Sequence, residues 1–486
     1  MKKILYQCFF ISAIIMASCQ KNITDLNINP TRPTSVASEN LFSNASINLS
    51  DRLASTNVNT NNFRLFVQYW TETIYRDETR YNLNGRSITD RWWAGFYRDV
   101  IKDLTEASKQ IDKETSLAAG EVVNRKAINE ILIVFAYYHL LTSFGDIPYT
   151  DALDIEKLQP NYDNSAEVFG KISARLEAAL TSLDPTSPAY GAADFILNGD
   201  VEGWKKFGNS LKMRMGMLVA DVDPATAQTM VLAAAPNVIT SNEGNIKMRY
   251  LASPPNTNPI WEDLVQSGRH DFIAAKPFMD TLIAYNDPRL PLYFNPAITE
   301  GNGYVGQEPG RRAAFGDFSA PSSTISAPEF PHTFFSYSEM ELLKAEAVER
   351  GFAVGGTAEE HYNNAIDASI IEWGGTAADA MAYRSQPSVM YSKAAGTFKE
   401  KIGLQSWLAL YNRGYDEWTQ WRRLDYPILN VPFGAASNFA NDETPSVITR
   451  LTYPVVEQNL NKANYDKASA AVGKDQKTQK LWFDKF

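Results

Sequence analysis

Aromatic and charged side chains alternate over residues 70–86, and no helical period runs through the whole stretch. Exposed aromatic rings pack on apolar faces such as those of pyranose sugars, and charged hydrogen bonds orient the hydroxyls around them. We look for such a surface in aperiodic stretches, because aromatics at helical spacing are needed for the core. The candidates in this stretch and just after it are Trp70, Tyr75, Arg76, Asp77, Tyr81, Arg86 and Trp92.

Two later stretches have the same character. Residues 256–271 form a loop opened by Pro254, Pro255 and Pro259, and residues 301–326 are rich in turn-forming residues around Tyr304, which predicts a mobile rim. For any single residue in these loops, an ordinary or semi-buried loop position is the competing interpretation. The candidate ligand contacts of the first loop are Trp261, Arg269, His270 and Asp271.

Familiar catalytic motifs are absent from the sequence, which lacks H-E-x-x-H, G-x-S-x-G, G-x-x-x-x-G-K-[ST] and a strand followed by G-x-G-x-x-G. The chain has only four histidines, which are too scattered to indicate a metal site, and we expect no cofactor and no catalytic residue. Hydrolysis of a glycosidic bond needs only two suitably separated carboxylates, however, and 56 acidic residues leave that alternative open.

The N-terminus is typical of an export signal. Lys2 and Lys3 precede a mostly apolar run over residues 4–16, which is too short to span a bilayer. Met16-Ala17-Ser18-Cys19 resembles the lipobox of bacterial lipoproteins, whose cysteine receives a diacylglycerol and an acyl chain such as palmitate. This predicts a signal peptide at 1–18 and a lipidated tether at 19–30, anchored through Cys19. An ordinary secretory signal is the alternative.

Composition limits the partners of the exported chain. Its net charge is −10, or about −12 without Lys2 and Lys3, so no basic excess favours nucleic acid. Cys8 leaves with the signal, which leaves one cysteine and no internal disulfide. A hydrophobic core must therefore stabilise the protein, and we expect a single domain over residues 31–486.

Helical periodicity predicts the elements that position the candidate loops. A helix over residues 63–73 would place Phe63, Phe66 and Trp70 on one face, and a helix from Asp90 would place Trp92 away from its apolar side. Apolar residues also recur at helical spacing over residues 122–143 and from Ser165 onward.

A second helical hairpin is predicted from two capping boxes, Ser338-x-x-Glu341 and Thr357-x-x-Glu360. The apolar stripe of its second helix, which includes Tyr362 and Ala365, ends at Gly374-Gly375. Each hairpin has about the length of a tetratricopeptide unit, which favours a mostly α fold. Unrelated helix pairs in an all-α protein are the alternative.

Several charged motifs have simple structural interpretations. Asp287-Pro288-Arg289 predicts a rigid corner, and the helix dipole alone favours Arg422 and Arg423 at a helix end. We expect three glutamates to be caps or parts of an exposed helix face, namely Glu339, Glu341 and Glu346.

Several longer motifs together resemble the SusD/RagB family, and most closely its SusD-like 2 subgroup. The resemblance covers essentially the whole mature chain. It is carried by Phe144-Gly145-Asp146-Ile147-Pro148-Tyr149, by residues 198–214, by Asp287-Pro288-Arg289-Leu290-Pro291, by Trp418-x-x-Trp421-Arg422-Arg423, and by Arg450-x-x-Tyr453-Pro454.

The resemblance implies an outer-membrane lipoprotein, facing the cell exterior, that binds a nutrient and delivers it to a SusC-like TonB-dependent barrel. It also implies four tetratricopeptide-like helix pairs with loop-rich insertions that form the ligand face. A glycan is the expected ligand. The alternatives are a peptide-binding RagB-like component, a surface glycoside hydrolase, and an interaction scaffold without a small ligand.

Overall fold

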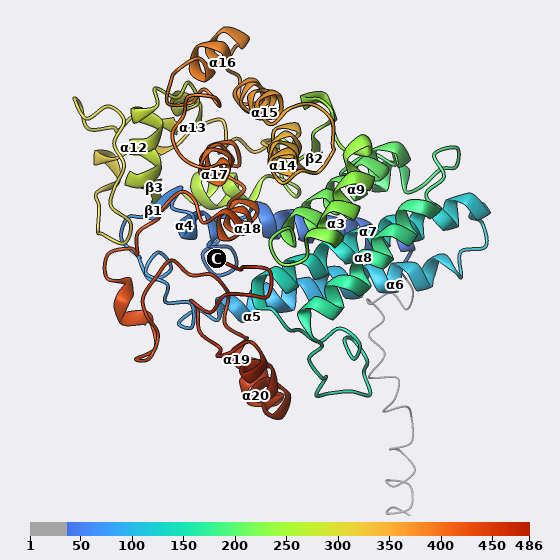
Figure 1. Ribbon diagram of the computed structural model, residues 1–486. Coiled ribbons are helices and arrows are strands. Elements are labelled where there is room, and N and C mark those ends of the chain that lie inside the picture. The colour runs from blue at the N-terminus through green and yellow to red at the C-terminus, as the bar shows by residue number, and fades with distance from the viewer. Residues whose placement is uncertain (1–35) are drawn as a thin grey trace, which may run out of the picture. The chain divides into compact units, whose positions relative to one another are not determined.

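Helices dominate the computed structural model, which describes residues 36–486 (Figure 1). The prediction of a mostly α fold is confirmed. Ser38–Phe486 form one compact unit. The predicted signal peptide, the tether and Cys19 lie outside the described residues.

One long apolar helix, α7 (Ala119–Phe144), lies at the centre of the first half of the scaffold. By length and hydropathy it could cross a membrane, but 94% of its apolar window is buried inside the protein, so it is a core helix. It contains the predicted helix over 122–143, and its partner begins at Ser165 as predicted, with Asn164 as the cap. The helices that contact α7 include α3 (Ser38–Ala54), α6 (Lys102–Ile111), α8 (Ser165–Ser182) and α9 (Val201–Leu218), and α10 (Pro224–Ala234) packs on α9.

The second half of the scaffold repeats the arrangement of paired helices. Helices α14 and α15 form one hairpin and α17 and α18 another, so that with α7–α8 and α9–α10 the fold contains four tetratricopeptide-like pairs. The capping box of Thr357 and Glu360 is confirmed, whereas α14 is capped by Ser336 and not by Ser338. The bounds are α14 (Tyr337–Glu349), α15 (Ala358–Glu372), α16 (Ala377–Arg384), α17 (Phe398–Ala409) and α18 (Gly414–Leu424).

The remaining helices are short and lie before, between and after the hairpins in the sequence. They are α4 (Phe63–Phe66), α5 (Ile88–Ala94), η1 (Gly95–Ile101), η2 (Gly191–Ala193), η3 (Ala235–Asn237), η4 (Asn242–Gly244), α11 (Pro259–Trp261), η5 (Glu262–Gln266), α12 (Lys276–Ala284), α13 (Leu290–Tyr293), η6 (Phe315–Asp317), η7 (Ala435–Asn438), α19 (Val455–Leu460) and α20 (Lys462–Ala471).

Short antiparallel strand pairs join segments that are distant in the sequence: β1 with β3, β2 with β6, and β4 with β5. In each pair, the second strand follows the first only after a loop or a much longer stretch of the chain. The strands are β1 (Trp70–Glu72), β2 (Ile246–Met248), β3 (Phe272–Ala274), β4 (Phe294–Asn295), β5 (Ala320–Pro321) and β6 (His332–Phe335).

The predicted helix over residues 63–73 is wrong beyond Phe66. Gln68 adopts a left-handed backbone (φ 56°), which ends the helix, and Trp70–Glu72 form β1 instead. Tertiary contacts outweigh the local period here. The backbone of β1 pairs with β3, and the Trp70 indole N–H donates to the Tyr411 hydroxyl at 2.9 Å.

The three glutamates predicted at a solvated face are buried, and this prediction is corrected. Glu339 accepts hydrogen bonds from Arg214 Nε (2.7 Å) on α9 and from Arg413 Nη2 (2.5 Å). Glu346 likewise accepts a hydrogen bond from Arg423 Nη2 at 2.6 Å. Arg423 therefore binds a carboxylate of the protein and does not interact with the helix dipole alone. Glu341 pairs with Lys344 and His361. The reason is that α14 is covered on several sides, by α9, α15 and α17.

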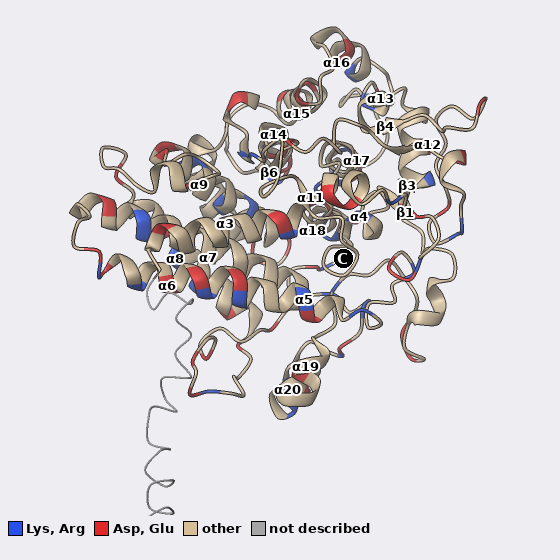
Figure 2. Ribbon diagram, turned by 180° about the vertical axis from the view of Figure 1, so that it is seen from behind, with Lys and Arg blue, Asp and Glu red and all other residues tan. Residues whose placement is uncertain are grey.

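The corner at Asp287 and Arg289 is confirmed as structural, because both side chains are buried and paired at 2.6 Å. At the surface, acidic and basic residues are interspersed along the helices in the view of Figure 2.

Candidate functional site

The ladder between β1 and β3 brings together two of the three predicted loops. Trp70 lies opposite Ala274 and Glu72 opposite Phe272, so the chain after β1 runs beside the chain before β3. Beyond the ladder, Thr73 N donates to the Asp271 carbonyl at 2.9 Å, and Thr73 Oγ1 donates to the His270 carbonyl at 2.9 Å. The loop after residue 72 and the loop before residue 272 are therefore neighbours.

The third predicted loop, residues 301–326, reaches the same place. Ala313 N donates to the Thr73 carbonyl at 3.0 Å, and Ala274 N donates to the Ser319 carbonyl at 2.7 Å. The Phe315 ring lies against the His270 ring, with centroids 4.4 Å apart. Three segments that are far apart in the sequence thus meet at one surface, which we call the loop site.

The loop site contains a depression of about 230 Å³. Its rim includes an exposed ion pair, Arg269 Nε to Asp271 Oδ2 at 2.6 Å, which offers both hydrogen-bond donors and acceptors. Its lining is otherwise mainly apolar and aromatic, and consists of Leu264, Val265, Arg269, His270, Asp271, Phe272, Asn295, Pro296, Ile298, Phe315, Phe318, Ala320, Pro321 and Ser326.

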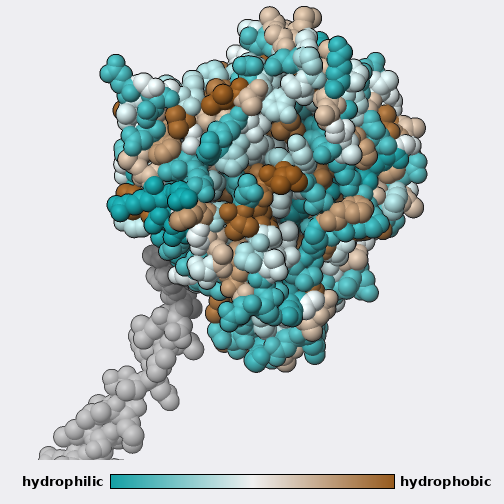
Figure 3. Space-filling model, turned by 60° about the vertical axis from the view of Figure 1, so that its left-hand side comes forward, coloured by the Kyte–Doolittle hydropathy of each residue, from teal (hydrophilic) through white to brown (hydrophobic). Residues whose placement is uncertain are grey.

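Tyr75 is the most exposed aromatic side chain of the predicted set. It is 62% exposed and follows Ile74, which is 53% exposed. Asp77 is exposed as well, and Arg76 is half-buried. These residues, 73–78, form a loop that we call the Tyr75 loop. Figure 3 turns forward the side on which β1 and β3 are labelled in Figure 1, and shows apolar residues in separate groups on a mostly hydrophilic face.

Three predicted contact residues belong to the core, and the prediction is corrected for them. Trp70 is 1% exposed, and Tyr81 and Trp92 are 0% exposed. The Trp92 indole stacks on Tyr415 and its N–H donates to Ser143 Oγ at 3.0 Å, while Tyr81 packs edge-on against Phe66. These three aromatic side chains are close in sequence to an aperiodic loop, and they anchor it by packing in the core.

The remaining predicted residues are distributed around the loop site. Arg86 is partly exposed and its Nε lies 2.6 Å from Glu78 Oε1. Trp261 is half-buried at the end of α11 and does not line the depression. Phe315, Phe318 and Ile298 line it but were not singled out in the sequence. The two phenylalanines could have been noticed as aromatics inside a turn-rich stretch, whereas nothing marks Ile298.

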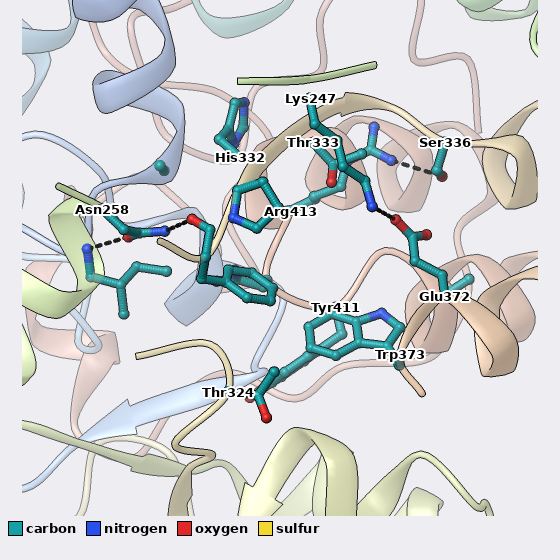
Figure 4. Close-up of a pocket in the computed structure, with 16 residues that line it drawn as sticks. Lys247, Asn258, Thr324, His332, Thr333, Ser336, Glu372, Trp373, Tyr411 and Arg413 are labelled. Atoms are coloured by element: carbon teal, nitrogen blue, oxygen red, sulfur yellow. Dashed lines mark hydrogen bonds and ion pairs between the residues drawn. The ribbon is translucent and has the colours of Figure 1, made fainter. Parts of the chain in front are cut away.

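A second cavity, drawn in Figure 4, lies among the scaffold elements and contains none of the predicted residues. Its volume of about 90 Å³ suits a few water molecules rather than a sugar ring. Lys247 and Glu372 pair across it at 2.8 Å. Burial lowers the pKa of His332 on its wall to about 3, so this side chain is neutral. We assign this cavity a structural role.

Within residues 36–486, no group of three or more histidine, cysteine, aspartate or glutamate side chains is arranged to hold a metal ion. The side chains present at the loop site, Arg269, His270 and Asp271 in the depression and Tyr75 on the neighbouring loop, can stack, make apolar contacts and form hydrogen bonds.

Comparison with known proteins identifies the class of this fold. Residues 30–454 match the SusD-like 2 family, which is described as starch-binding and associating with the outer membrane. The chain therefore belongs to this family, as the sequence motifs predicted. No curated protein matches the sequence.

Several solved structures share the fold. A chitin-binding protein is 25% identical, with a TM-score of 0.76 over 92% of this chain and 99% of that one. A SusD homologue from Bacteroides uniformis is 24% identical, with a TM-score of 0.78 over 92% and 99%. A chitin-binding SusD homologue from Flavobacterium johnsoniae is 20% identical, with a TM-score of 0.76 over 92% and 98%.

Proposed function

We propose that this protein is a lipid-anchored glycan-binding protein of the outer membrane that takes up an oligosaccharide of the starch or chitin kind at the loop site. The observation that supports this most is a depression lined by two of the three predicted loops, with the Tyr75 loop hydrogen-bonded to both of them, in a chain whose family is described as starch-binding. The printed descriptions of two structural relatives name chitin as the ligand of those proteins.

The chemistry of the loop site fits a sugar better than a charged ligand. Tyr75 and the His270–Phe315 pair offer flat faces for the C–H surfaces of pyranose rings. Arg269 and Asp271 are already paired with each other, so together they add little net charge while still reaching hydroxyl groups. The surface is open, which suits an oligomer whose two ends extend beyond the depression.

Isothermal titration against starch, chitin and other glycan fragments, with peptides in the same panel, tests the ligand class. We expect saturable binding of one glycan class. Binding of peptides alone would instead favour a peptide-uptake role. The titrated ligand is then recovered after long incubation and analysed for products. Intact ligand supports a binding protein, and released fragments would favour a glycoside hydrolase.

Delivery of the ligand to a SusC-like TonB-dependent transporter completes the proposal. It is supported by family membership and by the Met16–Cys19 sequence, which predicts acylation of Cys19. Co-purification with a membrane barrel in mild detergent tests the partner. Isolation of the protein alone under the same conditions would contradict it.

Exposure on the outer face of the cell is also part of the proposal. Protease treatment of intact cells tests it directly. We expect the protein to be cleaved before lysis, and full protection until lysis would mean that the anchor faces inward.

A further inference from the structure

The Tyr75 loop is closed at its base by one glutamate. Glu72, the last residue of β1, accepts two hydrogen bonds at Oε2, from Thr79 N and from Thr79 Oγ1, both at 2.8 Å. Thr79 Oγ1 in turn accepts from Glu72 N at 3.3 Å. Residues 73–78 lie between these two positions. The Glu72 carboxyl therefore determines how the loop that presents Tyr75 leaves the strand and returns to the core.

A second glutamate, Glu78, is a charged and hydrogen-bonding neighbour of the Glu72 carboxyl. Glu72 is 2% exposed and Glu78 is 0% exposed. Neither Glu78 oxygen receives a well-oriented hydrogen bond from another part of the described chain. Glu78 contacts one cation, Arg86, whose Nε lies 2.6 Å from Glu78 Oε1. Among residues 36–486, no other basic side chain forms an ion pair with either carboxyl.

The charges of this group do not balance if both carboxyls are ionised. Two buried negative charges would face one partly exposed arginine, and an uncompensated buried charge is strongly unfavourable. One proton shared by the two carboxyls removes the excess charge and supplies the hydrogen that Glu78 lacks. Closely spaced carboxyls titrate as a unit in this way.

We propose that Glu72 and Glu78 share one proton and act as positioning residues that hold the Tyr75 loop in its ligand-ready shape, so that loss of the proton loosens the loop. This rests on the proposed function only in assigning the loop to ligand binding. The shared proton and the closure of the loop follow from the contacts themselves.

The groups that shift the pKa of Glu72, besides its burial, are Glu78 and Thr79. Across the ladder, Glu72 lies opposite Phe272, and the 301–326 segment approaches the loop base through the backbone of Ala313. Asp271 is paired with Arg269, and the exposed Asp77 forms no ion pair. Burial, followed by the charge of Glu78, raises the pKa of Glu72 well above its usual value.

The direction of the pH effect follows from that raised pKa. The folded loop binds a proton that an open, solvated loop releases, so closure is favoured at low pH and is weakened as pH rises through the raised pKa of Glu72. The transition is therefore sought above the usual pKa of a glutamate carboxyl, which is about 4.3.

Hydrogen exchange of the ligand-free, full-length protein tests the proposal. After correction for the intrinsic pH dependence of exchange, protection of peptides covering residues 72–82 should fall above the transition by up to about tenfold per pH unit, as expected for one linked proton. In Glu78→Gln the amide N–H replaces the shared proton, so protection should stay constant across the range. Asp77→Asn, a change in the same loop, should retain the wild-type response.

Thr79→Val removes the two hydrogen bonds that Thr79 Oγ1 makes with Glu72 and keeps the shape of the side chain, so it should lower protection of the loop at every pH. Wild-type protection that does not change with pH would overturn the proposal, and so would a pH response that persists in Glu78→Gln. Because no ligand is present, these results do not depend on glycan binding. If chito- or malto-oligosaccharides bind, their affinity should fall over the same pH interval; if none binds while the exchange result holds, only the proposed function fails.

Discussion

Tyr75 is the single residue on which the glycan-binding proposal depends most. Its ring is 62% exposed although it is large and largely apolar, and it lies on a loop that is tied to two other loops. Replacement of Tyr75 by alanine should weaken glycan binding by about 0.5–1.5 kcal/mol, or about two- to tenfold, because a stacking contact is lost. Isothermal titration of the variant measures this loss.

Phe195→Ala provides a matched control for Tyr75→Ala. Phe195 is also a partly exposed aromatic (42%), but it lines a different depression, near α9 and β2. Its replacement should leave the affinity unchanged. The opposite result, with binding lost in Phe195→Ala and kept in Tyr75→Ala, would move the ligand site away from the three loops.

His139 makes the stability of the fold sensitive to acid. It is fully buried in α7, its Nδ1 lies 2.8 Å from the Phe135 carbonyl, and burial lowers its pKa to about 4. An unfolded histidine has a pKa of about 6.5, so between about pH 6.5 and about pH 4 the unfolded chain binds one more proton at this site. The stability that the neutral histidine provides is present above about pH 6.5 and is lost as pH falls toward 4.

His139→Phe should therefore flatten the pH dependence of stability. The free energy of unfolding of the wild type should decrease more steeply than that of the variant, by up to about 1.4 kcal/mol per pH unit. Urea unfolding at several pH values between 7 and 4.5 measures both slopes. Parallel slopes would mean that His139 titrates normally in the folded protein.

At single positions, the sequence identifies candidate residues by their type, but it does not predict which of their side chains are buried. Tyr75, Arg269 and His270 are exposed as predicted, but Trp70, Tyr81 and Trp92 are buried, although all six are near aperiodic stretches. The difference depends on partners that lie far along the chain, such as Tyr411 for Trp70 and Tyr415 for Trp92. No local pattern contains that information.

At the scale of elements, α14 depends on arginines from its neighbours. Glu339 is the shared partner of Arg214 and Arg413, and all three side chains are buried. Glu339→Gln removes the carboxylate charge and leaves two buried guanidinium groups whose remaining ion-pair partner among residues 36–486 is Asp416. We expect a loss of about 3–5 kcal/mol in the free energy of unfolding, as for other buried pairs that lose one partner.

Denaturant unfolding of Glu339→Gln at neutral pH measures this loss. The control is Glu329→Gln, because Glu329 is exposed and forms no ion pair with the described residues, and its stability should change by less than about 0.5 kcal/mol. Equal stabilities of the two variants would show that the buried cluster does not hold α9, α14 and α18 together.

Helices with a complete local pattern are predicted well, and helices that end early for tertiary reasons are not. The α15 helix has a capping box, an apolar stripe and a terminal glycine pair, and each of these is found in the structure. The residue 63–73 segment has a helical period but forms α4 and then β1, because the ladder with β3 and the turn at Gln68 take precedence. Local periodicity cannot predict pairing with a strand that lies about two hundred residues later in the sequence.

At the scale of the whole molecule, the sequence identifies the three loops but not their meeting. Residues 73–78, 269–271 and 313–319 are joined by backbone hydrogen bonds across long sequence separations. The loops were predicted separately from their aromatic and turn-forming residues. The loops converge because of the way in which the helix pairs pack. The hydrophobic pattern of the sequence does not determine that packing.

The anchor is a further property of the whole molecule. Cys19→Ser should abolish incorporation of labelled palmitate and release the protein from the membrane fraction, because no acyl chain can then be attached. Metabolic labelling with fractionation measures both effects. Cys8→Ser is the matched control, since Cys8 is predicted to leave with the signal, and it should not change labelling. Unchanged membrane attachment of Cys19→Ser would contradict lipid anchoring.

The central claim is that the three loops form a glycan-binding surface, and titration of the purified protein with chito- and malto-oligosaccharides of increasing length tests it most directly. We predict saturable binding of one series, tighter for oligomers than for the monosaccharide, reduced about two- to tenfold in Tyr75→Ala and unchanged in Phe195→Ala. Absence of binding to every glycan tested, or binding that is indifferent to Tyr75 and to the other residues of the loop site, would contradict the account.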